Sequence, residues 1–505
     1  MSARLFAKTY ESFLEKIAIG VIGVRSTLDT LQKQGHNPIP MEKGTTSFKI
    51  WASFKTKRFR VPDIVCLDCG KRFEVRAKTK PEISMSHSER DPDRAWDYGL
   101  TDEDYVVVVS CKRRGTKPID WECVGPLHFV LVGDLRATYT EGNTFFTKSK
   151  GREEGFERRL IWPAKFAKKS GKVVEVNEEF VKLEVNGRKR KYSLTLKRKQ
   201  DDEEKSIKMM PLVKNGEIVA ENQSIASVVD IKHEIPCKKS EANEEIFINL
   251  LSSSSRVDRF IGAKALRYFP KSPKVIDALK EKLNDSREEK LILYEVAASL
   301  LELNQKEGEE FIKETLNSHD PYSIHEIIIS LCELTPSKSF NLIKNVLIDE
   351  TIPEAVRVTA AWGLGELKLR EATDVLIDTF NSISSEIKKE AARALFQITL
   401  EQNNEYFKEL LGLFKSQNEN VREGLSWVIA KTLENRGNGS SLSDILDLVV
   451  DENSKLWVSY ILGTQEPSKY ETIKEEIRRK DEKVFFAVNL LWVILRSWIW
   501  ELKEY

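Results

Sequence analysis

From about residue 240 to the C-terminus, the apolar positions of the chain recur with a fixed spacing. Five segments share a small residue, a leucine, two variable positions and a further apolar residue. Their leucines are 34, 31, 33 and 31 residues apart: Leu266, Leu300, Leu331, Leu364 and Leu395. This period fits two antiparallel helices and two short turns per unit. A single helical hairpin cannot bury its apolar face, so the pattern predicts a stack of such units, with each leucine in the shared core.

The register of this repeat weakens after Ile398, and we expect further degenerate units at Val421–Ala430 and Trp457–Leu462. The last part of the chain is rich in aromatic residues: Trp492, Trp498, Trp500 and Tyr505. Two interpretations stay open for this tail. It forms a terminal helix that covers the last repeat, or it exposes an apolar patch to a protein partner or a second copy of the chain.

The N-terminal half has a mixed pattern that predicts an α/β core. A helix is expected from about Arg4 to Lys33, interrupted around Gly20 and Gly23 and ended by Asn37-Pro38. A short helix is expected around Asp93–Leu100. The expected strands are Ser47–Trp51, Arg60–Leu67, Arg72–Lys78 and the continuous apolar run Tyr105–Ser110.

Between these halves, residues 155 to 235 alternate in short strand-like runs. Strands are expected at Lys172–Val176, Phe180–Val185 and Lys191–Leu196, with Asn186-Gly187 as a hairpin turn and Asp201–Lys205 as a charged loop. The region from Val213 to Val229 is loosely similar to barrel-sandwich folds. We therefore expect a small β-barrel-like middle domain at 146–238, between an α/β domain at 1–145 and the helical repeats at 239–505.

Charge and cysteine content change this picture only locally. The formal net charge is +1, so whole-chain charge indicates no partner, but the segment from Lys148 to Lys199 is dense in basic residues. That segment is either a solvated face or a nucleic-acid contact. Six cysteines without a recognisable signal peptide predict a reducing, cytoplasmic environment. No apolar run reaches the ~18 residues that a membrane span needs.

The candidate chemistry lies on two neighbouring strands. Asp63 opens one strand, and Glu74, Arg76 and Lys78 share one face of the next, because alternate residues of a strand point the same way. A tight hairpin between the strands would place Asp63 near Glu74. Two carboxylates in an apolar core are costly unless a cation lies between them. Oxygen ligands favour Mg²⁺ or Mn²⁺.

This arrangement, over about residues 1 to 134, resembles the PD-(D/E)XK nucleases, a superfamily that includes many restriction endonucleases. The resemblance implies that Asp63 and Glu74 hold the metal ion. It also implies a lysine two positions after the glutamate, where this chain has Arg76. Arginine cannot act as a base. Arginine can still hold a phosphate or orient water, and Lys78, one pleat further on, could take the lysine role instead; the choice between Arg76 and Lys78 stays open. A first-helix carboxylate often joins such sites, and Glu11 and Glu15 are the candidates.

The turn between the two strands, Cys66-Leu67-Asp68-Cys69-Gly70, resembles a zinc knuckle. A closed zinc site needs four ligands, and Cys111 and Cys123 are the nearest remaining candidates in the sequence. The alternative is that these cysteines are reduced structural thiols. A zinc ion here would be structural and would hold the hairpin that carries the two carboxylates.

The repeats resemble HEAT and armadillo units, although their period is shorter than that of usual HEAT units. The resemblances together predict a metal-dependent DNA endonuclease that hydrolyses phosphodiester bonds, in a bacterial defence or restriction system, with DNA and protein partners. The solenoid or the Trp-rich tail would bind a partner or form a homo-oligomer. The alternative is a non-catalytic adaptor, or a nucleic-acid-binding protein with an inactive nuclease-like domain. The choice between DNA and RNA stays open.

Overall fold

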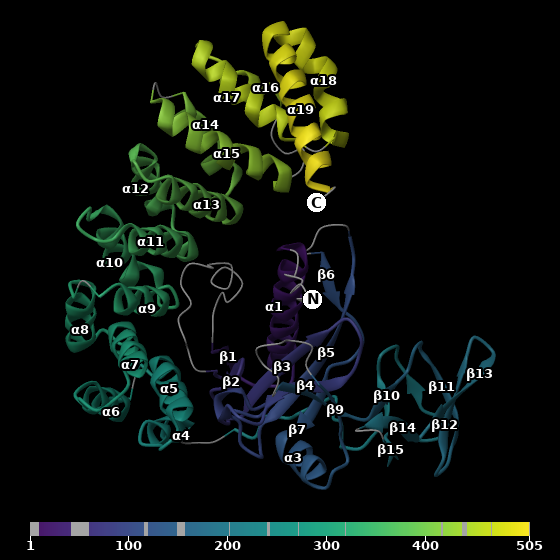
Figure 1. Ribbon diagram of the computed structural model, residues 1–505. Coiled ribbons are helices and arrows are strands. Elements are labelled where there is room, and N and C mark those ends of the chain that lie inside the picture. Colours follow the sequence, from purple (N-terminus) through teal and green to yellow (C-terminus); the bar gives the residue numbers. More distant parts are fainter. Residues whose placement is uncertain are drawn as a thin grey trace, which may run out of the picture. The chain divides into compact units, whose positions relative to one another are not determined.

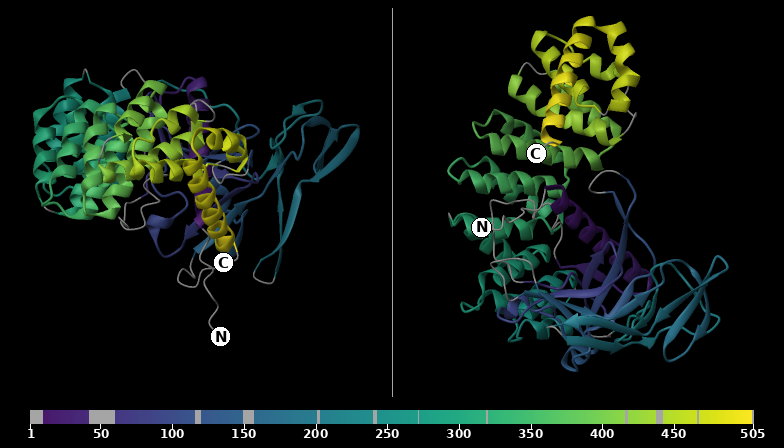
Figure 2. Two further views of the ribbon diagram at one scale, coloured as in Figure 1. Left: turned by 90° about the horizontal axis from the view of Figure 1, so that it is seen from above. Right: turned by 45° about the vertical axis from the view of Figure 1, so that its right-hand side comes forward.

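The computed structural model (Figures 1 and 2) describes residues 10–41, 60–115, 120–148, 157–200, 203–239, 243–270, 272–318, 320–415, 418–436, 442–465 and 467–503. The chain divides into two compact units between Lys282 and Leu283. The finer domain boundaries expected at 145/146 and 238/239 stay predictions. Within the described residues, no helix combines the length and the apolarity that crossing a bilayer requires.

The first unit contains a mixed sheet covered by one long helix (Figure 1). Strands β1 (Pro38–Pro40), β2 (Ile64–Cys66) and β3 (Arg72–Lys78) form an antiparallel meander, and β3 pairs in parallel with β5 (Tyr105–Arg113). β5 also pairs with β6 (Trp121–Cys123) and β7 (His128–Leu131). The apolar run at the start of β5 is buried on both faces of the sheet, so apolar residues do not alternate with polar ones there. The predicted α/β core is confirmed.

Helix α1 (Tyr10–Lys33) packs against β3 and β5. The interruption expected at Gly20 and Gly23 is wrong, because the helix is continuous through both residues. A Cβ atom added at Gly23 would lie 2.5 Å from the Cβ of Ala77. This glycine therefore lets the helix approach β3 closely. Residues 1–9, where the helix was expected to begin, and the strand expected at 47–51 lie outside the described residues.

A second, smaller sheet covers the other side of the core. It has the order β4 (Ile83–Ser88), β9 (Glu157–Trp162), β8 (Phe145–Lys148), and α3 (Val132–Thr140) follows β7 directly. Buried Trp96 and Trp162 meet edge to face in this layer. The helix expected around residues 93–100 is reduced to one short 3₁₀ turn at Pro92–Arg94.

The middle region is built from small antiparallel sheets. The largest has the order β13 (Arg188–Ser193), β12 (Phe180–Val185), β11 (Gly171–Val176), β17 (Ile218–Val219). Asn186 and Gly187 both have positive φ, 51° and 73°, as the predicted hairpin turn requires. Two further sheets are β10 (Ala164–Phe166), β18 (Ser224–Ser227), β16 (Met210–Pro211) and the pair β14 (Thr195–Gln200), β15 (Glu203–Lys208).

The expected barrel is wrong, because the described strands of this region do not close on themselves. β13 forms an edge, and its residues Arg188 to Lys191 are all exposed. A row of like charges discourages the pairing of a further strand at that edge. The loop expected at Asp201–Lys205 is also wrong from Glu203 on, where β15 begins; 201–202 lie outside the described residues.

Helices α4 (Asn243–Leu250), α5 (Arg256–Ala265) and α6 (Pro273–Leu283) follow the middle region. Leu266 is fully buried at the start of a 3₁₀ turn that continues α5. An ion pair of 2.7 Å joins Asp258 of α5 to Arg72 of β3. This contact ties the first helical hairpin to the α/β core.

The second unit is a succession of helical hairpins. One series of helices packs each on the next: α7 (Lys290–Glu302), α9 (Pro321–Leu331), α11 (Glu354–Leu367), α13 (Ser385–Glu401), α15 (Glu419–Arg436), α17 (Glu452–Gly463) and α19 (Glu482–Lys503). The intervening helices are α8 (Lys306–Leu316), α10 (Pro336–Ile348), α12 (Thr373–Asp378), α14 (Asn404–Phe414), α16 (Leu442–Leu446) and α18 (Pro467–Lys480). The helical-repeat prediction, including the degenerate units after Ile398, is confirmed.

The repeat leucines and the small residues before them behave as the spacing predicts. Leu300, Leu331, Leu364 and Leu395 are all fully buried. A Cβ atom added at Gly363 would lie 3.1 Å from Ile328 of α9, so the small residue allows α9 and α11 to approach. The buried leucine and the close approach are what a stacked hairpin needs.

The terminal helix α19 covers the last hairpin and also exposes apolar side chains. Trp492 stacks on Tyr470 of α18, with ring centroids 5.0 Å apart, and Val488 is buried. Phe486, Leu490 and Val493 are exposed on the same helix. The covering helix is thus present. The side chains of Trp498 and Trp500, and residue Tyr505, lie outside the described residues.

Candidate functional site

Strand β3 places the predicted residues on one face, as its alternation requires. Phe73 and Val75 point into the core beneath α1, whereas Glu74, Arg76 and Lys78 occupy the opposite face. The expected bounds of this strand, Arg72 to Lys78, are confirmed.

Asp63 directly precedes β2, on the strand that pairs with β3. Its Oδ2 atom accepts a hydrogen bond of 2.7 Å from the backbone N–H of Val75. Asp63 therefore lies against β3, and its expected role as a metal ligand beside Glu74 stays a prediction. This hydrogen bond joins the Asp63 carboxylate to β3 and stabilises the β2–β3 hairpin.

Glu74 is almost fully buried and is neutralised by two arginines. Its Oε1 atom lies 2.8 Å from Arg76 Nη2 and 3.4 Å from Arg60 Nη2. A buried carboxylate is stable only when it is paired, and two guanidinium groups supply that pairing here. The resemblance to nucleases implies a metal ion at this carboxylate.

Lys78 points towards β4. Its Nζ atom donates hydrogen bonds of 2.6 Å to both the carbonyl oxygen and the hydroxyl of Ser84. Burial lowers the pKa of Lys78 to about 8; Glu82 opposes the change, and Arg159 and Arg76 add to it. Arg159 also donates to the Ser84 hydroxyl, at 3.0 Å.

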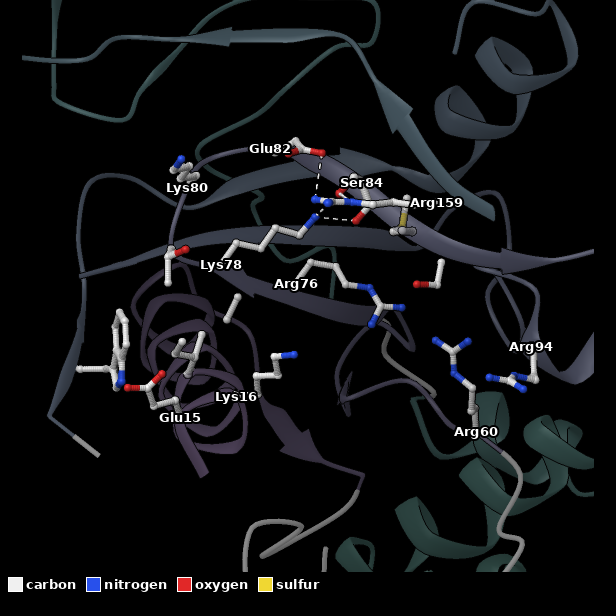
Figure 3. Close-up of a pocket in the computed structure, with 16 residues that line it drawn as sticks. Glu15, Lys16, Arg60, Arg76, Lys78, Lys80, Glu82, Ser84, Arg94 and Arg159 are labelled. Atoms are coloured by element: carbon white, nitrogen blue, oxygen red, sulfur yellow. Dashed lines mark hydrogen bonds and ion pairs between the residues drawn. The ribbon is translucent and has the colours of Figure 1, made fainter. Parts of the chain in front are cut away.

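Arg76, Lys78 and Arg159 border a pocket of about 1010 Å³, whereas Asp63 and Glu74 are not among its lining residues. It lies between α1, the end of β3, β4, β6 and β9 (Figure 3). Its lining within the described residues contains seven basic and two acidic residues: Lys16, Arg60, Arg76, Lys78, Lys80, Arg94 and Arg159, against Glu15 and Glu82. Such an excess of positive charge in a concave site attracts anions.

Both acidic residues of the lining already have cationic partners. Glu15 lies 3.0 Å from Arg113, and Glu82 lies 3.1 Å from Arg159. Arg60, Arg76 and Arg94 gather on one side of the pocket in Figure 3, and Arg76 Nε finds no hydrogen-bond partner within the described residues. Of the two first-helix carboxylates considered, Glu15 thus reaches the pocket, and the Glu11 side chain lies outside the described residues.

The residues present fit a magnesium ion poorly. Glu74 is occupied by two guanidinium groups, and within the described residues Asp63 and Glu74 belong to no group of three or more side chains that could share an ion. A divalent cation placed here would face arginines, whose charge repels it. The arginine side chains around this position favour binding of an anion instead.

The cysteines fall into two separate sets. Cys66 and Cys69 lie together with His36 and Cys237. Cys111 and Cys123, expected as the third and fourth zinc ligands, instead face each other across the β5–β6 pair with their sulfurs 3.9 Å apart. That part of the predicted ligand set is corrected. Cys111 and Cys123 are 12 residues apart and lie opposite each other on paired strands. His36 and Cys237 come to Cys66 and Cys69 from segments that are distant in sequence.

A scan against models of known protein families and a search of curated proteins find no match for this chain. Solved helical structures show a weak likeness. The complex of CpcE and CpcF of phycocyanin lyase from Nostoc sp. PCC7120 is 16% identical, with 52% of this chain and 98% of that chain covered and a TM-score of 0.25. Human deoxyhypusine hydroxylase is 15% identical, with 46% and 86% covered and a TM-score of 0.19.

A designed armadillo repeat protein in complex with the peptide (KR)4 is 16% identical, with 50% and 100% covered and a TM-score of 0.18. Likeness at these TM-scores assigns neither a fold nor a function to the chain. The helical-repeat architecture rests on the packing of the helices themselves.

Several residues of the pocket could not be predicted from the sequence. Lys16, Arg60, Arg94 and Arg159 come from four separate segments and follow no local motif. The only signal available was their charge, and charged residues occur throughout the chain. Their convergence is a product of the fold.

Proposed function

We propose that the first unit binds the phosphate groups of a nucleic acid in the basic pocket and does not hydrolyse them. The observation that carries this proposal is the lining itself, in which seven basic residues face two acidic ones that are already paired. Phosphate chains are bound mainly by lysine and arginine, with release of counterions. This corresponds to the non-catalytic alternative that the sequence left open.

A second basic surface supports a polymer as the ligand. Residues Arg188 to Lys191 of β13 are exposed in the same unit. A small anion needs one pocket, whereas a nucleic acid extends over several contacts. Two basic surfaces in one unit therefore favour a chain of phosphates over a single one.

The test is binding of labelled single-stranded DNA, duplex DNA and RNA, followed by fluorescence anisotropy at several salt concentrations. Lys16, Lys80 and Arg94 are exposed pocket residues, so their triple replacement by alanine spares the core. We expect affinity to fall and the slope of log affinity against log salt to decrease by about three, one for each lost phosphate contact.

The matched control removes three exposed basic residues outside the pocket: Lys274, Arg287 and Lys306. It should leave the affinity and the salt slope close to those of the native chain. Equal losses in both triple variants would show that binding is a general charge effect, and the pocket proposal would fail. Binding of a mononucleotide but of no polymer would restrict the ligand to a small anion.

Metal-dependent cleavage remains a hypothesis that one assay decides. Incubation of the chain with plasmid and Mg²⁺, repeated with EDTA, should leave the plasmid intact, because the two arginines at Glu74 occupy the place of a metal ion. Cleavage that EDTA and Glu74→Gln both abolish would establish the endonuclease and overturn the non-catalytic proposal.

The helical unit is proposed to act as the scaffold for a protein partner or a second copy of the chain. Stacked helical hairpins present long continuous surfaces of this kind. Light scattering of the purified full chain distinguishes the two cases. A dimeric mass would assign the surface to self-association, and a monomeric mass would leave it to another protein.

A further inference from the structure

Four metal-ligating side chains meet outside the basic pocket. The ligand atoms of His36, Cys66, Cys69 and Cys237 all lie within 4.8 Å of one another. His36 and Cys66 are buried, and Cys69 and Cys237 are half-buried. They form the only such group of His, Cys, Asp and Glu within the described residues.

The turn after helix α1 places the histidine. Gly35 has a positive φ of 85°, its N–H bonds to the Gln32 carbonyl, and the His36 N–H bonds to the Leu31 carbonyl. This pair of bonds is the Schellman arrangement, which ends a helix and fixes the direction of the next residue. His36 therefore enters the core at a defined position and meets Phe73 edge to face.

The turn between β2 and β3 places the two cysteines of the C-x-x-C motif. The Gly70 N–H bonds to the Cys66 carbonyl at 2.9 Å, and Gly70 has a positive φ of 70° that other residues rarely adopt. The Leu67 N–H bonds to the Asn37 carbonyl, which joins this turn to the residue after His36. Both cysteines thus face the histidine.

The fourth ligand arrives from the segment that leaves the middle region. The side-chain amide of Gln34 holds this segment twice, donating to the His233 carbonyl at 3.1 Å and accepting from the Ile235 N–H at 2.9 Å. Cys237 follows two residues later. Its sulfur lies 3.8 Å from that of Cys66.

These separations match a tetrahedral zinc ion. Zinc bonds sulfur at about 2.3 Å and histidine nitrogen at about 2.0–2.1 Å, so two sulfurs on one ion lie about 3.8 Å apart and a sulfur and a nitrogen about 3.5 Å apart. The observed values are 3.8 Å between Cys66 and Cys237 and 3.7 Å between Cys69 Sγ and His36 Nδ1. Hydrogen-bonded thiols alone do not require four ligands around one point.

The outer contact of the histidine also fits. His36 Nε2 lies 2.7 Å from the Ile235 carbonyl oxygen. A carbonyl only accepts, so Nε2 carries the proton, and Nδ1, on the side of Cys69, keeps its lone pair. Metal-binding histidines are usually held in this way by a second partner.

We propose that His36, Cys66, Cys69 and Cys237 bind one structural Zn²⁺. Four protein ligands leave no open position for substrate, so the site is structural and not catalytic. The ion joins three segments: the end of α1, the β2–β3 turn and the chain after the middle region. Its first and last ligands, His36 and Cys237, are 201 residues apart in sequence. It thereby fixes the hairpin that carries Glu74 and Arg76.

The first test is elemental analysis of the full chain, purified without chelator. We expect about one zinc per chain, lost in Cys237→Ser and retained in Cys123→Ser, since Cys123 lies outside the group. Retention in Cys237→Ser with loss in Cys123→Ser would refute this ligand set. An unsubstituted chain that contains no zinc and takes none up from added ZnCl₂ would refute the site altogether.

A second test avoids variants that fail to fold. The unsubstituted chain, stripped of metal and titrated with Co²⁺, should develop the strong visible absorption of a tetrahedral ion and thiolate charge-transfer bands, both saturating at one equivalent. Zinc should then slow alkylation of Cys69 and Cys237 by about ten-fold or more, because metal-bound thiolates are poorly accessible. Cys123, also half-buried, is the internal control and should not change. Equal alkylation of Cys69 and Cys237 with and without zinc would overturn the proposal.

Discussion

The Glu74 carboxylate lies 2.8 Å from the guanidinium group of Arg76, two positions along the same strand. Arg60, from the segment before β2, approaches the same oxygen at 3.4 Å. The resemblance to nucleases assigns this carboxylate to a metal ion. In the folded chain it instead forms ion pairs with two of the basic groups around the pocket, and this relationship determines what replacing Glu74 should do.

Glu74→Gln should strengthen nucleic-acid binding. The change removes one negative charge and releases Arg60 and Arg76 from their ion pairs, so the affinity measured by fluorescence anisotropy should rise on the order of five-fold, or ~1 kcal/mol for one close charge contact. Circular dichroism should show an unchanged fold. Weaker binding by the folded variant would show that the carboxylate helps to hold the ligand and would contradict the anion-pocket proposal.

The charge of Lys78 should make binding depend on pH. Its pKa is lowered to about 8, so the ammonium is charged at pH 7 and largely neutral at pH 9. Affinity for nucleic acid at constant salt should therefore fall between these values. The charged groups that act on this pKa are Glu82, Arg159 and Arg76. Lys78→Arg, which stays charged, should bind equally at both pH values.

The lowered pKa of Lys78 also predicts that the free energy of unfolding depends on pH. This dependence has the opposite direction to that of the binding affinity. Because the folded-state pKa of Lys78 lies below the ordinary value of 10.5, the folded chain binds fewer protons than the unfolded chain between about pH 8 and 10.5. The contribution of this residue to the free energy of unfolding should therefore rise with pH in that window. Urea titrations of the native chain and of Lys78→Met at pH 7 and 9.5 isolate this contribution. A difference in unfolding free energy between the two proteins that is the same at both pH values would contradict the lowered pKa of Lys78.

Leu331→Ala should destabilise the helical unit by about 2–5 kcal/mol, the usual loss for a buried leucine. Leu331 is fully buried in α9. The matched control is Leu400→Ala on α13, where the side chain is 45% exposed and the loss should be much smaller. Urea unfolding followed by the helical circular dichroism signal measures both. Equal losses would contradict the placement of the leucines in a shared core.

Two glycines in the helical unit should respond in opposite ways to alanine. A Cβ atom at Gly365 would lie 2.8 Å from Ala394 Cα, so Gly365→Ala should separate α11 from α13 and cost about 1–3 kcal/mol. A Cβ atom at Gly412 would meet nothing within 4 Å, so Gly412→Ala should stabilise α14 by about 0.5–1 kcal/mol. Thermal unfolding of both variants measures the two changes in stability. If both variants were destabilised, the loss in Gly365→Ala could not be attributed to the close packing at Gly365.

The sequence by itself determined the elements whose signal is local. The repeat leucines recur every 31 to 34 residues, and helical hairpins with a buried leucine follow from that spacing alone. The bounds of β3, the Asn186-Gly187 turn and the shared face of Glu74, Arg76 and Lys78 were predictable for the same reason. Each depends on residues within one or two turns or strands of one another.

Only the tertiary structure decided which distant side chains meet. Three sets of residues come from segments whose separation in sequence carries no signal: Arg60 at Glu74, the pocket residues Lys16, Arg94 and Arg159, and His36 and Cys237 beside Cys66. The glycine at position 23 illustrates the same point, since its role appears only where α1 crosses Ala77. Local patterns fix elements because hydrogen bonds and side-chain periodicity are local. A site built from several elements depends on how their buried faces pack, and that packing is a property of the whole fold.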